Sequence, residues 1–181
     1  MKVIVIYKDM SDKEYDNLDF DSWERIEEIN IVEFFYQDEL HFLPDNIDKL
    51  INLEYLKITN CNLESLPESI GNLTKLEELH CTNCKLTSLP ESIGNLASLK
   101  FLSLSFNQLT ILPESIGNLT NLIILECNHN KLTSLPDSLG KLVNLELFYC
   151  NCNLLTKIPS SLKDLEYLEV LNHNHNLVDL S

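Results

Sequence analysis

The sequence repeats itself at a fixed interval of 23 residues, and this period restricts the possible folds more than any other property of the chain. The segment Leu66–Leu73, which reads Leu-Pro-Glu-Ser-Ile-Gly-Asn-Leu, returns at Leu89–Leu96 and Leu112–Leu119, and more loosely at Leu135–Leu142. A unit this short cannot cover its own apolar face, so it becomes stable only when neighbouring copies stack on it. The period therefore predicts an elongated array of stacked units.

A second pattern, Leu-x-x-Leu-x-Leu-x-x-Asn/Cys-x-Leu, lies ahead of each copy. It begins at Leu53, Leu76, Leu99, Leu122 and Leu145. Its fourth and sixth residues point to the same side of a short strand, because side chains alternate along a strand. Its ninth position holds Cys61, Cys84, Asn107, Asn130, Asn153 and Asn176. The pattern predicts one strand per repeat, stacked in parallel about 4.7–4.9 Å apart.

These residues resemble the leucine-rich-repeat family over residues 30–181, and the 23-residue form is similar to the intracellular plant Ras-group and scribble-like repeats. The resemblance implies an α/β fold, a right-handed solenoid curved into a horseshoe, with a parallel sheet on the concave side and short helical or 3-10 turns on the convex side. It implies that the ninth column forms an inner ladder that satisfies backbone groups. It also implies a signalling or scaffold role, with a protein partner such as a small GTPase or a phosphatase.

The two ends of the chain depart from the repeat. We expect residues 1–29 to form an N-terminal cap and residues 30–181 to hold one degenerate, five full and one partial repeat. The degenerate repeat would have its strand at Ile31–Tyr36. The last copy starts at Leu168 and has no convex half before Ser181. Two explanations stay open: an unusual or truncated end, or an open edge that pairs with a second copy of the chain.

The expected cap combines a strand with a helix. The apolar run Val3–Tyr7 predicts the strand. Helical spacing separates four apolar residues, namely Phe20, Trp23, Ile26 and Ile29. Asp21 followed by Glu24 is similar to a capping box, which predicts a helix start, with Trp23 covering the first repeat.

The charge of the chain excludes some partners. It has 13 basic and 28 acidic residues, a net charge of −15. Such a chain lacks the basic surface that nucleic acid requires, and an anionic membrane would repel it. The first apolar run is too short for a signal peptide, and no apolar stretch approaches the ~20 residues of a membrane span. We therefore expect a soluble cytoplasmic protein.

The candidate binding site is the concave face, which is formed by the third, fifth, seventh and eighth residues of each repeat. The predicted partner-binding residues are Tyr55, Glu78, His80, Phe101, Phe106, Ile124, Glu126, His129, Leu147 and Tyr149. Exposed aromatic and aliphatic side chains in the middle of this set would mark an interaction surface. The alternative is that these side chains only pack along the sheet, since such residues favour strands in any case.

The sequence shows no catalytic constellation and no cofactor motif. Cys81, Cys127 and Cys150 fall in the core column, and the columns explain the cysteine spacing without a disulfide framework or a zinc motif. Cys152 is the exception, because it shares a solvent-facing column with His129 and His175. These three define an alternative metal or thiol site, although no fourth ligand follows from the pattern. We predict a non-catalytic protein-binding module, with self-association through the C-terminal edge as the alternative.

Overall fold

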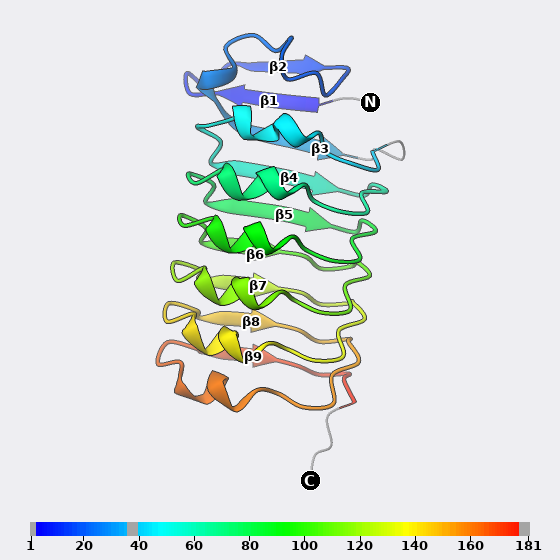
Figure 1. Ribbon diagram of the computed structural model, residues 1–181, viewed down its shortest axis with the longest axis vertical. Coiled ribbons are helices and arrows are strands. Elements are labelled where there is room, and N and C mark those ends of the chain that lie inside the picture. Colours follow the sequence, from blue (N-terminus) through cyan, green and yellow to red (C-terminus); the bar gives the residue numbers. More distant parts are fainter. Residues whose placement is uncertain (1–2, 36–39, 178–181) are drawn as a thin grey trace.

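The computed structural model describes residues 3–35 and 40–177, and its strands form one continuous sheet (Figure 1). The strands are β1 (Val3–Tyr7), β2 (Asp12–Tyr15), β3 (Ile29–Phe35), β4 (Tyr55–Thr59), β5 (Glu78–Thr82), β6 (Phe101–Ser103), β7 (Ile124–Glu126), β8 (Leu147–Tyr149) and β9 (Val170–Asn172). Their spatial order is β2-β1-β3-β4-β5-β6-β7-β8-β9. Strands β3 to β9 are parallel, whereas β1 is antiparallel to both of its neighbours. The predicted parallel stack is confirmed from β3 onward.

Each repeat, or rung, returns to the next strand through a turn on the other side of the molecule, and Figure 1 shows these turns as a second layer. The turns contain the 3-10 helices η2 (Asp45–Lys49), η3 (Glu68–Asn72), η4 (Glu91–Asn95), η5 (Glu114–Asn118), η6 (Asp137–Lys141) and η7 (Ser160–Asp164). Each starts directly after a proline, whose fixed φ suits a helix start and whose missing N–H would have had no partner there. Among the described residues, the convex segments are thus 3-10 rather than α-helical.

The hydrophobic core lies between these two layers. The fourth residue of successive rungs is 0% exposed in each case: Leu56, Leu79, Leu102, Leu125 and Phe148. On the outer side, Ile70, Ile93 and Ile116 are also 0% exposed. Each such side chain stabilises the fold by roughly 1.5–3 kcal/mol, and none could be buried by its own rung alone.

From Asn107 onward the ninth column is a ladder of asparagines, as the family resemblance implies, and it begins with Cys61 and Cys84. The Asn130 Oδ1 atom accepts the Leu109 N–H at 3.0 Å. Its Nδ2 atom donates to the carbonyl oxygens of Leu104 at 2.9 Å and Cys127 at 3.1 Å. Asn107, Asn153 and Asn176 make equivalent bonds to the rung before their own. One side chain thereby satisfies three backbone groups where the chain leaves the strand.

Glycine allows the convex turns to stack closely. A Cβ atom added to Gly71 would lie 2.4 Å from the carbonyl oxygen and 2.7 Å from the Cβ of Ser92 in the next rung. Gly94, Gly117 and Gly140 face the serine of the following turn in the same way. The Ser-Ile-Gly-Asn signature of the repeat is therefore a packing requirement between turns.

The N-terminal segment is a β-hairpin on the first rung, and the predicted helix at Phe20–Ile29 is wrong. The strand at Val3–Tyr7 is confirmed, but residues 20–25 form turns, and only the short 3-10 helix η1 (Ile26–Glu28) precedes β3. The expected capping box does not form, because the Glu24 N–H donates to the Tyr15 hydroxyl at 3.0 Å. The Asp21 carboxylate instead pairs with Lys49.

Trp23 is buried in the same core as the repeats. Its ring stacks on Tyr15 with centroids 4.6 Å apart, and it meets Phe20 edge-on at 4.5 Å. In the same hairpin, the Arg25 guanidinium lies over the Tyr7 ring and pairs with Asp9 at 2.7 Å. Aromatic stacking across the hairpin thus replaces the helix that the apolar spacing predicted.

The last described rung is only partly covered. Leu168 and Leu171 are half-buried, whereas their counterparts in the preceding rung, Leu145 and Phe148, are 0% exposed. His173 occupies the core column in this rung and is also half-buried. Leu177 is 62% exposed. Val178, a residue of interest for edge pairing, lies outside the described residues.

Candidate protein-binding face

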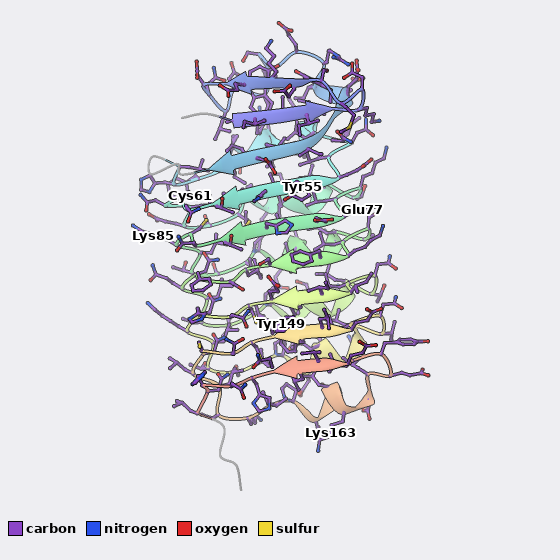
Figure 2. The ribbon with its side chains drawn as sticks, turned by 180° about the vertical axis from the view of Figure 1, so that it is seen from behind. Tyr55, Cys61, Glu77, Lys85, Tyr149 and Lys163 are labelled. Carbon is purple, nitrogen blue, oxygen red and sulfur yellow. The ribbon has the colours of Figure 1, made fainter. Side chains whose placement is uncertain are left out.

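The outward side chains of the parallel strands form ordered columns, because consecutive strands pair in register. Tyr55 pairs with Glu78, Glu78 with Phe101, and the column continues through Ile124 to Leu147. A second column runs through Lys57, His80, Ser103, Glu126 and Tyr149. We call the surface formed by these two columns and the adjoining residues 105, 106, 128 and 129 the sheet face. Figure 2 shows it toward the viewer, with Tyr55 on β4 and Tyr149 on β8.

Three neighbouring rings, a pair tilted by 41° followed by a stacked pair, occupy the N-terminal half of the sheet face. The ring centroids of Tyr55 and His80 are 5.2 Å apart, and those of His80 and Phe101 are 4.6 Å apart at an interplanar angle of 27°. The His80 Nε2 atom lies 3.2 Å from Glu78 Oε2. Burial, followed by the charges of Glu33 and Glu78, raises the pKa of Tyr55. His80 is therefore held between two aromatic rings with a carboxylate on its outer nitrogen.

A second ring pair lies at the C-terminal ends of the strands. Phe106 and His129 stack with centroids 4.3 Å apart and planes 9° from parallel. Phe106 is 52% exposed, so its ring is open to a partner. Both residues have positive φ, 59° for Phe106 and 52° for His129. Phenylalanine rarely adopts this left-handed conformation, and such strain clusters at binding surfaces.

The left-handed conformation is a property of the whole eighth column. Positive φ is found at Asn60, Asn83, Phe106, His129, Cys152 and His175. Asparagine and histidine tolerate this conformation better than most residues, which explains four of the six identities. The repeat pattern alone did not reveal it, although the frequent Asn and His before the ladder residue were a usable signal.

Between the ring stacks the sheet face is polar, and part of it is not exposed. Ser103 is 2% exposed and donates its hydroxyl to Glu126 Oε2 at 2.7 Å. Thr59 and Ser105 are 8% and 6% exposed, so these variable positions do not face solvent as expected. Small side chains in a column are covered by the larger side chains of the neighbouring rungs. Recognition of a partner therefore depends on the longer, exposed side chains around these small residues.

Asparagines extend this polar strip toward the C-terminal rungs. The Asn128 Nδ2 atom lies 3.4 Å from the Ser105 hydroxyl, and the Asn128 Oδ1 atom accepts the Asn151 N–H at 3.2 Å. A polar ladder at the seventh position thus joins Asn128 and Asn151, whereas the Asn174 N–H bonds within its own rung to Asn172. These hydrogen bonds hold the polar surface of the β6, β7 and β8 rungs in order.

The remaining predicted residues lie on the same surface. Ile124, Leu147 and Tyr149 are half-buried, as are His80, Phe101, Glu126 and Tyr55, whereas Glu78 and His129 are exposed. All ten predicted residues therefore reach the sheet face and retain accessible surface. Their role in binding stays a prediction.

The alternative metal site is not assembled. His129 is committed to its stack on Phe106, and the Asn151 Nδ2 atom lies 3.6 Å from Cys152 Sγ. Within residues 3–35 and 40–177, no group of three or more histidine, cysteine or acidic side chains is placed to hold a metal ion.

The six cysteines follow the columns. Cys81, Cys127 and Cys150 are 0% exposed in the core, and burial raises the pKa of each thiol, to about 12 for Cys150. Cys61 and Cys84 are buried in the ladder, and Cys152 is half-buried. A high thiol pKa leaves little thiolate at neutral pH, so the three core cysteines are poor nucleophiles.

A groove of about 470 Å³ lies away from the sheet face, where the strands begin. It is lined by Glu77, Ser98, Lys100, Asn121, Ile123, Asn144, Glu146 and Tyr167. Sequence reasoning missed it, because these residues stand beside the first leucine of each rung rather than on the strand. Glu77 and Lys100 pair across it at 2.7 Å, and the Asn121 and Asn144 amides bond to backbone carbonyls. Much of its polar lining is thus already engaged within the chain, and the sheet face remains the stronger candidate.

The stacked rungs, the asparagine ladder and the open sheet face define a repeat solenoid of the leucine-rich type. A family profile described as "leucine-rich repeat region" matches residues 34–105 and 90–179. The chain therefore belongs to the leucine-rich-repeat family. A comparison with curated protein sequences gives no match.

Several solved structures share this fold. A leucine-rich-repeat protein of Leptospira interrogans is 35% identical over 75% of this chain and 35% of its own, with a TM-score of 0.73. The ectodomain of the Arabidopsis thaliana receptor kinase GASSHO1/SCHENGEN3, solved with CASPARIAN STRIP INTEGRITY FACTOR 2, is 32% identical over 80% of this chain and 18% of its own, with a TM-score of 0.71. An internalin of Listeria monocytogenes has a TM-score of 0.72 at 21% identity, covering 84% of this chain and 44% of its own, and shows the fold alone.

The chain thus spans less than half the length of each of these structures. The fold is shared by extracellular receptor domains, so it does not establish the expected intracellular type. Across the described part of the chain, no helix combines the length and hydrophobicity that a membrane span requires.

Proposed function

We propose that this chain is a protein-interaction module that binds its partner through the sheet face and carries out no catalysis. The observation that supports this most is the two groups of rings, Tyr55–His80–Phe101 and Phe106–His129, on a surface that also carries the aliphatic Ile124 and Leu147. Aromatic side chains with one open face are the residues that most often dominate the free energy of binding. The leucine-rich-repeat fold is itself generally an interaction module.

The charge favours a basic partner. The chain carries a net charge of −15, and Glu78 and Glu126 lie on the sheet face beside the rings. A partner with lysine or arginine near an apolar anchor would gain ion pairs and cation–π contacts at this surface, and its association would be faster at low salt. The resemblance implies a small GTPase or another signalling protein as the partner, and a cytoplasmic location is part of the same proposal.

The test compares two double variants in affinity capture from the source cell extract. Glu78→Lys with Phe101→Ala changes the sheet face. Glu91→Lys with Ile111→Ala changes the convex side by the same charge, and Ile111 is 55% exposed. We expect partners captured by the unmodified chain to be retained by the convex variant and lost by the sheet-face variant, with all three chains equally folded by circular dichroism. Equal retention by both variants would exclude the sheet face.

Self-association through the last rung is a second candidate. The half-buried Leu168 and Leu171 and the exposed Leu177 favour it, because a second copy could cover them. Sedimentation velocity over a hundredfold concentration range tests it. We expect a dimer that strengthens with concentration and is lost on Leu171→Glu, whereas a monomer at every concentration would remove this candidate.

A further inference from the structure

Two ladder positions hold cysteine, and their sulfur atoms are in contact. Cys61 Sγ and Cys84 Sγ lie 2.9 Å apart in adjacent rungs, and the residues are 6% and 8% exposed. The two rungs are in register up to the pair Thr59–Thr82, two residues earlier. Figure 2 shows Cys61 at the edge of the sheet where the strands end. The same column that explains the cysteine spacing therefore brings two thiols together.

The backbone spacing at this point suits a covalent bond. Adjacent parallel strands lie about 4.7–4.9 Å apart, and a disulfide joins residues whose Cα atoms are about 4.4–6.8 Å apart. In-register ladder positions one rung apart fall within this window. A bond between Cys61 and Cys84 would consequently require only small side-chain adjustment.

The thiols contribute less to the ladder than the asparagines do. Cys84 Sγ lies 3.7 Å from the Ile58 carbonyl oxygen and 3.4 Å from that of Thr82, where Asn130 makes three bonds of 2.9–3.1 Å. A thiol is a weak donor, so little hydrogen bonding is lost when its proton leaves. This part of the ladder can exchange its sulfur contact for a bond at low cost.

We propose that Cys61 and Cys84 are a cross-linking site, at which thiol–disulfide exchange with a small-molecule disulfide such as glutathione disulfide joins the two rungs. The Cys61 thiolate attacks one sulfur of the reagent, breaks its S–S bond and releases one glutathione. Once Cys61 carries glutathione, the hydrogen bond that raised the pKa of Cys84 is gone, and Cys84 loses its proton, attacks the Cys61 sulfur and releases the second glutathione. Two cysteine thiols are oxidised, one glutathione disulfide is reduced, and the two cysteine protons end on the two glutathione molecules.

The sulfur contact shifts the pKa values of the two thiols in opposite directions. The hydrogen bond with Cys84, assisted by the Leu63 backbone, lowers the pKa of the Cys61 thiol. The same hydrogen bond, together with burial, raises the pKa of Cys84. The same disulfide forms whichever of the two thiols reacts first with the reagent, because the two sulfurs are in contact. Both are nearly covered, so the reagent reaches them only when the rung opens locally, and the reaction is slower than at an exposed thiol.

The chain provides a matched control pair. Cys127 and Cys150 are also one rung apart, in the core column, and both are 0% exposed. If stacking in a column were sufficient, this pair would cross-link as readily as Cys61 and Cys84. A selective bond between Cys61 and Cys84 would instead reflect the contact of their sulfurs together with their lower burial.

The experiment uses the full chain with Cys152→Ser, which removes the half-buried thiol. The folded protein is incubated with glutathione disulfide, quenched with acid, alkylated under denaturing conditions and mapped by mass spectrometry without reduction. We expect one linkage, between the peptides that carry Cys61 and Cys84, and two fewer alkylated thiols. The closed loop should raise the Tm by roughly 6–12 °C, reversibly with dithiothreitol.

Further outcomes decide against the proposal. Full alkylation of Cys61 and Cys84, mixed disulfides with glutathione that do not resolve, or equal cross-linking of Cys127 with Cys150 would each overturn it. Adding Cys61→Ser to the same background should abolish both the linkage and the rise in Tm. Circular dichroism of that variant shows that the loss is not caused by unfolding.

Discussion

Gly94 and Ser115 approach each other so closely that a Cβ atom on Gly94 would lie 2.4 Å from the Ser115 carbonyl oxygen and 2.8 Å from its Cβ. The φ of Gly94 is not positive, so no backbone conformation at this site demands glycine. Glycine is required because the adjacent turns lie too close together for a Cβ atom. A substitution at Gly94 therefore tests a steric effect alone, whereas a substitution at a glycine with positive φ would also test a conformational effect.

We predict that Gly94→Ala destabilises the protein by about 1–3 kcal/mol, because the added methyl group meets backbone rather than a side chain that could move. At an unstrained site the same change would stabilise by roughly 0.4–1 kcal/mol through the unfolded chain. The sign of the change in unfolding free energy, measured in urea, decides between the two. Asn95→Ala, at the exposed neighbouring position, serves as the control and should have little effect.

The asparagine ladder gives a second prediction. Asn130→Ala leaves the Leu109 N–H unpaired in a buried site and removes one of the two asparagine bonds to each of the Leu104 and Cys127 carbonyls, and we expect a loss of about 1–3 kcal/mol. Asn130→Cys should lose less, since cysteine occupies the same column at Cys84. Equilibrium unfolding measures both, with the exposed Asn118→Ala as reference. A neutral Asn130→Ala would show that the ladder does not stabilise the fold.

Substitutions of Phe106 test whether the backbone strain at this position serves partner binding. Asparagine favours the left-handed conformation, so Phe106→Asn should relieve roughly 1–3 kcal/mol of backbone strain, against about 0.5–1.5 kcal/mol lost with the His129 stack. We expect a net stabilisation of about 1 kcal/mol together with weaker partner binding. Thermal unfolding measures the first effect. A matching Phe106→Leu should remove the stack without relieving the strain, and a loss of stability on Phe106→Asn would contradict the argument.

The pH dependence of the N-terminal hairpin follows from Asp9. Hydrogen bonds from Ser11, and then from Arg25, lower the pKa of the Asp9 carboxyl to about 2, compared with about 3.9 in an unfolded chain. Because the folded pKa is the lower one, the ionised carboxylate stabilises the fold above pH ~4, and this contribution is lost as the pH falls through about 2. Stability is thus gained with rising pH in this window.

The variant Asp9→Asn should accordingly unfold at lower urea than the unmodified chain at neutral pH, with a difference that narrows between about pH 5 and pH 2. Trp23 is the single tryptophan, so its fluorescence reports on the hairpin directly. Asp16→Asn is an exposed control in the same segment. A difference that stayed constant across this range would show that the Asp9 charge is not responsible.

The repeat period predicted the fold because it fixed which residues share a column, and columns determine burial. Leu56, Leu79 and Asn130 are buried, as their positions in the columns predict. The period could not predict the hairpin, where Trp23 stacks on a residue eight positions earlier, Tyr15, instead of lying on a helix. Helical spacing of apolar residues indicates only that a segment has one buried side, and short irregular turns meet that condition as well.

The candidate site was predicted in position but not in detail. Columns placed Phe101 and His80 on the sheet face, yet their stacking depends on side-chain rotation. The burial of Ser103 could not be read from its own position, because the exposure of a small residue depends on the height of its neighbours. The contact between the Cys61 and Cys84 sulfurs could not be predicted for the same reason. Each cysteine suits the ladder by itself, and the two form a pair only when their rungs are stacked.

The glycines of the convex turns also determine the shape that a partner meets. A solenoid bends according to the difference between the spacing of its turns and that of its strands, and strand spacing is nearly invariant. Larger residues in place of Gly71, Gly94, Gly117 and Gly140 would wedge the turns apart and bend the stack more tightly around the sheet. The radius of curvature of the sheet face is thus set on the opposite side of the molecule, and selection for a different partner could act there without changing any residue in contact with it.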